Sequence, residues 1–355
     1  MTKTITINGR EIGPGLPTYI IAEMSANHNQ DYDTAVEMVH TAKRMGADAI
    51  KLQTYTPDTI TLNCRDEIFM CGEGTIWEGQ NLHDLYGKAY TPWEWQPKLK
   101  KIADEIGIDL FSSPFDFSAV DFLEDMNVQA YKVASFELVD IPLIKKMAAT
   151  GKTIIMSTGM ATYKEIQEAV DAIKSTGNEQ LALLKCTSSY PAPVDEMNLN
   201  RIPDLAKSFN VPSGLSDHSM ELAIPVAAVS LGGCIIEKHF TLTRSIKGPD
   251  SEFSLEPDEF EAMVKAVRIT EQALGIVDYN PTEKELVSRK YRRSLFVVKD
   301  IKKGETFTAE NIRSARPANG LHTRYYEIIL GETAANDLTF GQPLTEEMIS
   351  GGLKK

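Results

Sequence analysis

The sequence predicts an α/β fold, a (β/α)8 TIM barrel followed by a small, separate C-terminal domain. Eight short apolar runs, rich in Ile and Val, alternate with amphipathic stretches of helical periodicity. Each run is continuously apolar, which is typical of parallel strands covered on both faces. Eight such strands close a barrel, and the alternation stops after Leu274. We therefore expect a barrel over residues 1–275, a linker over 276–290 and a second domain over 291–355.

The predicted barrel elements can be placed in order along the chain. Strands are expected at Tyr19–Ser25, Ala49–Thr54, Asp109–Ser113, Ala130–Ser135, Thr153–Ser157, Ala182–Ser188, Ser213–Ser216 and Cys234–Phe240. Helical patterns include Thr34–Met45, Trp93–Ile106, Lys164–Ser175, Leu222–Leu231 and Asp258–Leu274. Capping-box spacing at Thr91-Pro92-Trp93-Glu94 and Thr162-Tyr163-Lys164-Glu165, and Pro257 at a first helical position, predict three helix starts.

Two further regions complete the organisation. The connection over residues 57–92 is unusually long, and in a barrel it would be an enlarged loop at the catalytic face. In the C-terminal part, a short charged helix precedes a strand expected at Arg293–Val298. A doubly wound open sheet is the alternative fold. The first predicted unit has no Gly-x-Gly-x-x-Gly sequence, which argues against a dinucleotide-binding version of that sheet.

Composition excludes several classes of function. With 42% apolar and 25% charged residues the chain resembles ordinary globular proteins rather than disordered ones. A net charge of -13 argues against a nucleic-acid partner. No apolar run approaches the ~20 residues that cross a bilayer, and the first fifteen residues lack a secretory signal pattern, so we expect a cytoplasmic protein with no membrane partner. The four cysteines show no Cys-x-x-Cys spacing and are expected to be buried, reduced thiols.

The predicted strands end in polar residues. The carboxyl ends of barrel strands form the active site. At or just after those ends lie Glu23, Lys51, Gln53, Ser113, Lys132, Ser135, Glu137, Ser157, Ser188, Ser216, His218, Glu237 and His239. So many polar groups at one rim predict a site for a polar ligand.

Two lysines within apolar strands suggest an anion site. Burying Lys51 or Lys132 costs several kcal/mol unless an anion compensates the charge. Together with hydroxyl groups from neighbouring strand ends, the two would cradle a phosphate or carboxylate. The alternative is an internal network in which each lysine pairs with Glu23, Glu137 or Glu237.

A histidine pair suggests a metal site. His218 and His239 close the seventh and eighth strands, and neighbouring strands lie about 4.8 Å apart, so both imidazoles could bind one divalent ion. Two nitrogen ligands would make this site weak and exchangeable. The alternative is that both are hydrogen-bonded core residues. Glu23 is placed for acid/base work or for orienting water, or else pairs with Lys51.

Other residues admit two interpretations. Asp250 follows the eighth strand and would bind a hydroxyl group or simply end a turn. Trp77, Trp93 and Trp95 would wall a sugar pocket, although helix packing explains the last two equally well. Lys132 could also be the Schiff-base lysine of a pyruvate lyase. A non-catalytic carbohydrate-binding or ice-binding protein is a further alternative, but it leaves the polar strand ends unexplained.

Several strings resemble the sialic acid synthase family, in order and over nearly the whole chain. They are Ala22-Glu23-Met24-Ser25-Ala26-Asn27-His28, Lys51-Leu52-Gln53-Thr54, Ser112-Ser113-Pro114-Phe115, Tyr131-Lys132-Val133-Ala134-Ser135-Phe136-Glu137, Ser157-Thr158-Gly159-Met160, Cys186-Thr187-Ser188-Ser189-Tyr190-Pro191, Gly214-Leu215-Ser216-Asp217-His218 and Glu237-Lys238-His239-Phe240. The segment from Arg293-Ser294-Leu295 to Arg316-Pro317 is similar to the antifreeze-like (SAF) domain that this family carries after its barrel.

The resemblance implies a reaction and its site residues. Such enzymes condense phosphoenolpyruvate with an open-chain aminosugar aldehyde, releasing phosphate, and use a divalent metal ion, Mn2+ in preference to Mg2+ or Co2+. By resemblance, phosphoenolpyruvate is bound by Lys51, Ser113, Lys132, Ser135, Ser157, Ser188 and Ser216, the metal by His218 and His239, and the sugar by Gln53, Glu137, Tyr190, Asp250 and Arg316. Glu23, His218 and His239 are the implied catalytic residues.

The resemblance also implies an assembly and a sugar. Arg316 matches an arginine that the antifreeze-like domain of one subunit delivers to the partner's barrel, which implies a domain-swapped homodimer. The stretch from Trp77 to Trp95, together with Ser188 and Ser219, is more similar to synthases of pseudaminic acid than to those of N-acetylneuraminate. The implied substrate is a diacetamido-trideoxyhexose, 2,4-diacetamido-2,4,6-trideoxy-L-altrose, with legionaminic acid synthases as the alternative.

Overall fold

The computed structural model describes residues 3–72 and 74–353. The chain divides into two compact units, one ending at Gly275 and one beginning at Ile276. Each has its own apolar core, and the two cores share no residue. No helix in the described ranges is long and apolar enough to span a bilayer.

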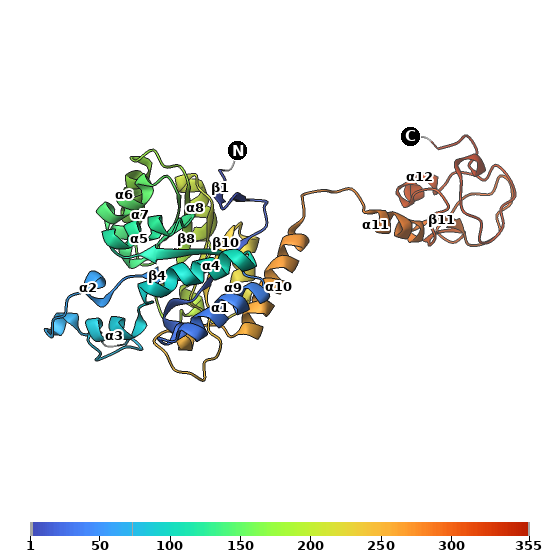
Figure 1. Ribbon diagram of the computed structural model, residues 1–355. Coiled ribbons are helices and arrows are strands. Elements are labelled where there is room, and N and C mark those ends of the chain that lie inside the picture. The colour runs from blue at the N-terminus through green and yellow to red at the C-terminus, as the bar shows by residue number, and fades with distance from the viewer. Residues whose placement is uncertain (1–2, 73, 354–355) are drawn as a thin grey trace. The chain divides into compact units, whose positions relative to one another are not determined.

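The first unit is a closed parallel barrel (Figure 1). Within the described residues its strands are β3 (Tyr19–Glu23), β4 (Ala49–Thr54), β5 (Asp109–Pro114), β6 (Ala130–Val133), β7 (Thr153–Ser157), β8 (Leu181–Cys186), β9 (Ser213–Asp217) and β10 (Ile235–His239). β10 pairs with β3 in register from Ile235 opposite Tyr19 to His239 opposite Glu23, which closes the sheet. The barrel prediction is confirmed, and the open-sheet alternative is wrong.

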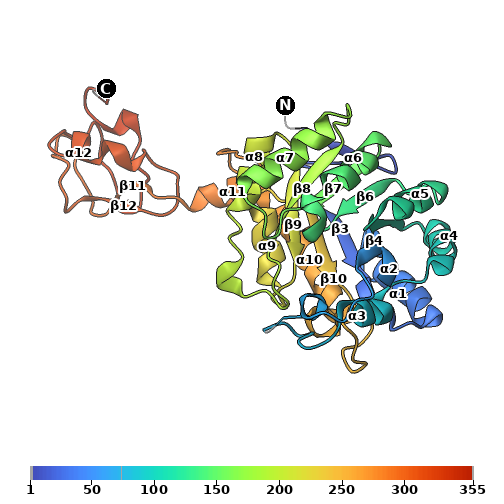
Figure 2. The same ribbon diagram turned by 90° about the vertical axis from the view of Figure 1, so that its left-hand side faces the viewer.

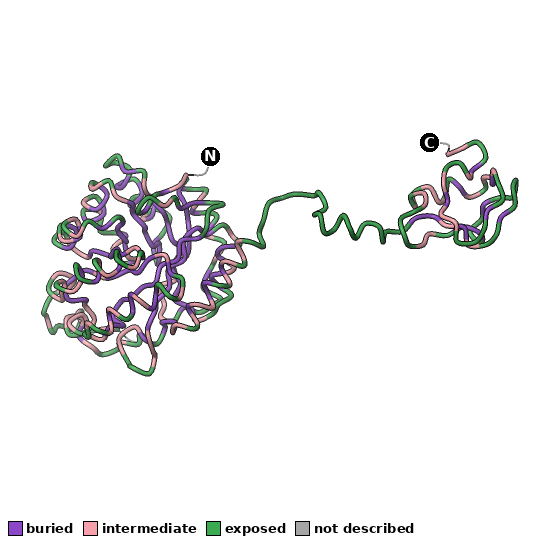
Figure 3. The backbone as a smooth tube through the Cα atoms, turned by 45° about the vertical axis from the view of Figure 1, so that its right-hand side comes forward, coloured by how far each residue is buried: buried purple, intermediate pink, exposed green. Residues whose placement is uncertain are grey.

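Helices surround the barrel, as Figure 2 shows. They are α1 (Tyr32–Arg44), α4 (Gln96–Ile106), α5 (Phe117–Asp125), α6 (Ile141–Ala149), α7 (Tyr163–Lys174), α8 (Arg201–Phe209), α9 (Ala223–Ser230) and α10 (Pro257–Leu274). Buried residues concentrate on the strands and on the inner sides of these helices (Figure 3). This layering explains why the strands are apolar on both faces.

The predicted helix starts had mixed outcomes. Thr162 and Glu165 form the expected capping box of α7, and Pro257 is the first residue of α10. The expectation at Thr91 was wrong, because α4 begins at Gln96 after a single 3-10 turn over Trp93–Trp95. The Thr91 hydroxyl instead bonds His28 Nε2 at 3.1 Å, so a tertiary contact takes the place of the local cap.

A hairpin that the sequence analysis did not predict covers the amino-terminal end of the barrel. It consists of β1 (Ile5–Ile7) and β2 (Arg10–Ile12), whose isoleucines are fully buried. The Thr153 hydroxyl at the start of β7 donates to the Thr6 carbonyl at 2.6 Å. The long connection lies at the opposite end, where the strands terminate. It contains α2 (Pro57–Ile60) and α3 (Leu82–Ala89).

The second unit contains α11 (Glu283–Ser288), α12 (Tyr326–Ile329) and the antiparallel pair β11 (Ser294–Val297) and β12 (Ile312–Ala315). Its small core includes Leu295, Phe307 and Leu344. Residues 307–311 are turn and coil that lead into β12. Of the four cysteines, all free, Cys186 and Cys234 are buried as expected, whereas Cys64 and Cys71 are only partly buried.

Gly214 in β9 provides a test of the barrel's packing. A Cβ added there would lie 2.2 Å from the Ile235 carbonyl oxygen of β10, a backbone atom that cannot move aside. We expect Gly214→Ala to lower the free energy of unfolding by about 1–3 kcal/mol, measured by urea denaturation. The control is Gly87→Ala in α3, where the nearest atom is at 3.8 Å and helix propensity predicts a gain of about 0.5–1 kcal/mol. Equal stability of the wild type and Gly214→Ala would contradict the packing argument.

Candidate active site

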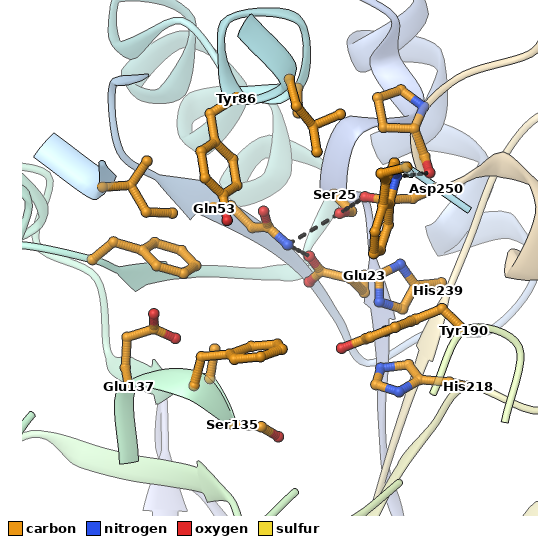
Figure 4. Close-up of a pocket in the computed structure, with 18 of the residues that line it drawn as sticks. Glu23, Ser25, Gln53, Tyr86, Ser135, Glu137, Tyr190, His218, His239 and Asp250 are labelled. Atoms are coloured by element: carbon orange, nitrogen blue, oxygen red, sulfur yellow. Dashed lines mark hydrogen bonds between the residues drawn. The ribbon is translucent and has the colours of Figure 1, made fainter. Parts of the chain in front are cut away.

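A cavity of about 510 Å3 opens at the carboxyl ends of the strands (Figure 4). Its volume is within the range of small-molecule sites. The structure brings together around it Glu23, Lys51, Gln53, Lys132, Ser135, Glu137, Ser157, Tyr190, Ser216, His218, His239 and Asp250. These residues come from several strands and from the segments that follow them, so only closure of the barrel makes them neighbours.

Buried charges form the floor of the cavity. Lys51 Nζ lies 3.2 Å from Glu23 Oε2 and 3.0 Å from Glu237 Oε1. Lys132 Nζ lies 3.7 Å from Glu237 Oε1 and donates to the Ser157 hydroxyl at 2.7 Å. The internal network considered as an alternative is therefore present, through Glu23 and Glu237. No such pair to Glu137 occurs among the described residues.

The protonation states leave this floor positive. Burial opposes ionisation of Glu237, but Lys132 and Lys51 outweigh it and lower the pKa of Glu237 to about 2. Burial raises the pKa of Glu23 to about 7 and lowers that of Lys132 to about 8. At neutral pH two ammonium groups thus face one full carboxylate charge and a second that is partly protonated. The floor can compensate an anionic ligand.

The histidine pair fits a divalent ion. The ring centroids of His218 and His239 are 5.2 Å apart. His218 Nδ1 lies 2.9 Å from the Thr187 carbonyl oxygen, which can only accept, so Nδ1 carries a proton. Burial opposes the charged form, but Cys186 outweighs it and raises the pKa of His218, so Nε2 has a free lone pair only in the neutral ring. Burial holds the pKa of His239 well below its usual range, and its buried Nδ1 has no hydrogen-bond partner among the described residues. His239 can therefore supply a neutral nitrogen ligand, and His218 can do so when a metal ion displaces the proton on Nε2.

The pair is not a closed metal cage. No group of three or more His, Cys, Asp or Glu side chains suited to a metal occurs among residues 3–72 and 74–353. Water and substrate oxygens would have to complete the coordination of an ion held here, as in an open catalytic site.

A buried ion pair behind the barrel wall holds the strands of both histidines together. Lys238 Nζ lies 2.7 Å from Asp217 Oδ2 and also donates to the Ser219 carbonyl. Asp217 in turn accepts from the Ser219 backbone amide at 2.8 Å. Side chains alternate along a strand. Asp217 and Lys238 therefore face outward, whereas the residues that follow them, His218 and His239, face the cavity. The pair thus restrains the two strand ends from outside.

Polar groups continue up one side of the cavity. The Gln53 amide donates to Glu23 Oε1 and to the Ser25 hydroxyl, both at 3.0 Å, and Ser25 donates to the Asp250 carboxylate. Asp250 is thus tied to the barrel rather than being a simple turn residue. The Tyr190 ring lies 4.4 Å from that of His218.

The tryptophans divide as follows. Trp77 lines the cavity, and its indole donates to the Pro249 carbonyl at 2.9 Å, which links the long connection to the loop after β10. Trp93 packs on Phe122 and Trp95 on His28 and Tyr32, outside the cavity. Helix packing is therefore the correct explanation for Trp93 and Trp95.

Three predicted site residues are not brought to the cavity wall. Ser113 is fully buried with an unpartnered hydroxyl but does not line the cavity. Ser188 lies beside Ser135, since both hydroxyl oxygens fall within 2.6 Å of the position of a Cβ on Gly159. Arg316 is exposed in the second unit, directly after β12.

Family models match both units of the chain. The NeuB family model matches residues 38–279, about two thirds of the chain, and the SAF domain model matches residues 292–350. The chain belongs to the NeuB family. The TIM barrel with a SAF domain is therefore the family architecture, as the resemblance implied.

Individual NeuB-family relatives resemble the whole chain. The pseudaminic acid synthase of Helicobacter pylori is 44% identical over 95% of this chain and 99% of its own length. The N,N'-diacetyllegionaminic acid synthase of Legionella pneumophila is 34% identical over 97% of this chain and 98% of its own. A solved structure of N-acetylneuraminic acid (sialic acid) synthetase from Leptospira borgpetersenii, in complex with citrate, shares 33% identity with a TM-score of 0.72, covering 81% of this chain and 95% of that one.

The sequence analysis missed some residues that line the cavity. Glu237 was expected among the polar strand ends but was given no role beyond an ion pair, although its place two residues before His239 predicts that both side chains share a face. Ser25 and Cys186 belong to the motifs that carry the family resemblance, but the sequence alone offered no reason to assign either of them a role. Tyr86 lies on α3, a helix of eight residues in the long connection for which no helical pattern was identified from the sequence. All four line the cavity.

Glu137 gives the site a measurable pH dependence. Burial raises the pKa of its carboxyl to about 7. The folded protein therefore binds more protons than the unfolded chain between roughly pH 4.5 and 7, so the contribution of Glu137 to stability falls as pH rises through that window and is constant above it. As pH rises from about 5 to 8, the free energy of unfolding should fall less for Glu137→Gln than for wild type, measured by urea denaturation.

The control for this measurement is an exposed glutamate on α7, Glu168→Gln. Its pH dependence should match wild type. Parallel curves for wild type and Glu137→Gln would contradict the burial argument.

Proposed function

We propose that this NeuB-family protein is a pseudaminic acid synthase. The reaction condenses phosphoenolpyruvate with 2,4-diacetamido-2,4,6-trideoxy-L-altrose and water to give pseudaminic acid and phosphate. The observation that carries the choice of product is 44% identity to the Helicobacter pylori pseudaminic acid synthase, against 34% to the legionaminic acid synthase of Legionella. The cavity supports the reaction class, because a positive floor and a histidine pair face one space.

The floor is proposed to bind phosphoenolpyruvate. Lys51 and Lys132 supply charge, and the hydroxyl groups of Ser135, Ser157 and Ser216 line the same cavity. The Ser216 hydroxyl donates a hydrogen bond to Glu237 at 2.9 Å. A bound anion could accept this hydrogen bond in place of Glu237. Ser113, whose side chain is buried, and Ser188, which lies beside Ser135, are proposed to bind phosphoenolpyruvate together with these groups.

The sugar is proposed to lie above the floor, with its aldehyde toward the histidines. Gln53, Glu137, Tyr190 and Asp250 border that space. A divalent ion on His218 and His239, Mn2+ with Mg2+ or Co2+ as alternatives, would supply Lewis-acid polarisation of the aldehyde oxygen. The role of the chain is to hold both rings neutral and oriented, through the Thr187 carbonyl and the Lys238–Asp217 pair.

The residues then account for each bond. The enol carbon of phosphoenolpyruvate forms the new C–C bond with the aldehyde carbon, leaving positive charge at the carbon that bears the phosphate. The Glu237 carboxylate stabilises that charge. Water adds to the same carbon, and Glu23 accepts its proton and passes it to the former aldehyde oxygen, which becomes a hydroxyl group. The C–O bond to phosphate then breaks, and the hydroxyl proton of the intermediate leaves with phosphate as the ketone forms. A Glu23 pKa of about 7 suits a group that accepts and returns a proton at neutral pH.

The decisive experiment offers phosphoenolpyruvate with a panel of aminosugars and measures phosphate release, with and without chelator. We expect release with the diacetamido-altrose sugar, and label in the bridging oxygen should leave with phosphate.

We expect His239→Ala to abolish turnover with an unchanged circular dichroism spectrum, while His40→Ala on α1 stays active. Preference for a legionaminic acid precursor or N-acetylmannosamine would overturn the product assignment. Borohydride trapping of Lys132 with pyruvate would instead support the lyase alternative.

We further propose that the enzyme is a domain-swapped homodimer, in which the SAF domain over residues 291–355 delivers Arg316 to the sugar site of the other subunit. The exposure of Arg316 at the end of β12 leaves its guanidinium available for such a contact. Because phosphoenolpyruvate is a cytoplasmic metabolite, we propose that the enzyme works in the cytoplasm.

Subunit complementation tests the swap. Arg316→Ala and Lys132→Met should each be nearly inactive as pure proteins. After the two are unfolded together and refolded, mixed dimers pair an intact barrel with an intact Arg316 from the other chain, and roughly a quarter of wild-type activity should return. No recovery, with mixed dimers demonstrated by mass spectrometry, would place Arg316 in cis or outside the site.

A further inference from the structure

The side of the cavity remote from the histidines is apolar. We call it the apolar lobe and define it by Ile60, Leu82, Leu85 and Tyr86, which all come from the long connection between β4 and β5 and line the cavity. Leu82, Leu85 and Tyr86 belong to α3, whose first residue is Leu82. The charged floor described above comes from the strands. The cavity thus has two chemically different ends.

Two polar groups face this lobe. Figure 4 shows Tyr86 and Glu137 directed into the cavity on the side opposite His218 and His239. The Tyr86 hydroxyl has no hydrogen-bond partner within residues 3–72 and 74–353, and Glu137 Oε2 is buried with none. The two are close enough for the Glu137 charge to help raise the pKa of Tyr86, after burial itself.

Glu137 presents a buried oxygen that lacks a partner among the described residues, and the half-buried Tyr86 lines the same cavity. A buried polar atom without a partner costs free energy comparable to a lost hydrogen bond. A ligand group that offers both a donor and an acceptor would satisfy Tyr86 and Glu137 together. A secondary amide offers an N–H and a C=O, and the methyl end of an acetamido group would contact the apolar side chains around it.

We propose that the apolar lobe selects the sugar, with Tyr86 and Glu137 binding the acetamido group at C4 and with Leu82 and its neighbours contacting the methyl group at C6. This inference rests on the proposed function, since that function puts the aldehyde carbon at the histidines. The far carbons of the chain, C4 to C6, then lie toward the lobe. Tyr86 is the specificity-determining residue.

The distribution of polarity predicts the direction of discrimination. A sugar with hydroxyl in place of the C4 acetamido group leaves Tyr86 and Glu137 without an amide partner. A hydroxymethyl group at C6 would bring a hydroxyl against apolar side chains. Unpaired polar groups of this kind reduce kcat/KM by about 10- to 100-fold.

A cycle of two enzymes and two sugars tests the proposal. The sugars are 2,4-diacetamido-2,4,6-trideoxy-L-altrose and its analogue with a C4 hydroxyl group, and the enzymes are wild type and Tyr86→Phe. We expect Tyr86→Phe to lower kcat/KM for the diacetamido sugar about 10-fold or more, mainly through KM, and to leave the analogue unchanged. Tyr163→Phe, an exposed tyrosine on α7, is the matched control.

A second variant tests the apolar contact. Leu82→Gln replaces an apolar side chain by a polar one of similar helix propensity at a half-buried position, so folding should be preserved. We expect it to reduce the preference for a C6 methyl over a C6 hydroxymethyl group by about 10-fold.

The outcomes separate this proposal from the function on which it rests. An equal loss on both sugars, or no loss, would overturn the role of Tyr86 while wild-type turnover of the diacetamido sugar still supported the proposed function. If wild type instead preferred N-acetylmannosamine, both the role of Tyr86 and the proposed function would be contradicted.

Discussion

The buried charges of the barrel floor are the constraint on which the rest of the site depends. Lys51 and Lys132 lie inside a closed barrel with Glu23 and Glu237 as their counter-charges. Removing one partner from such a cluster leaves an uncompensated buried charge, at a cost of about 3–5 kcal/mol. The cluster therefore requires both glutamates for folding. It also keeps excess positive charge for an anion, because the pKa of Glu23 is raised.

Around this floor, different parts of the chain perform different tasks. The strands supply charge and imidazole at positions that the sheet register determines, such as His239 opposite Glu23. The long connection supplies apolar walls, and Trp77 fastens it to the loop after β10. Reaction chemistry thus comes from rigid elements, whereas the groups proposed to discriminate between sugars come from a connection whose sequence can vary without disturbing the sheet.

Much of this could be predicted from the sequence, for identifiable reasons. Continuously apolar runs predict buried parallel strands, and the observed strand bounds lie within one or two residues of the expected ones. Period-two alternation also predicts that Glu237 and His239 share a face. The failures were non-local. The hydroxyl of Thr91 bonds His28 instead of capping a helix, and the β1–β2 hairpin is stable only because the barrel end buries its isoleucines.

The sequence by itself determined the kinds of groups at each strand end, the count of strands that closes a barrel and the family to which the chain belongs. Only the tertiary structure decided which groups meet. Lys51 and Glu237 are far apart along the chain, and they become neighbours because β10 pairs with β3 to close the sheet. Tyr86 and Glu137 line one cavity because α3 of the long connection lies at the barrel mouth. No local periodicity encodes such approaches, since they depend on packing between distant segments.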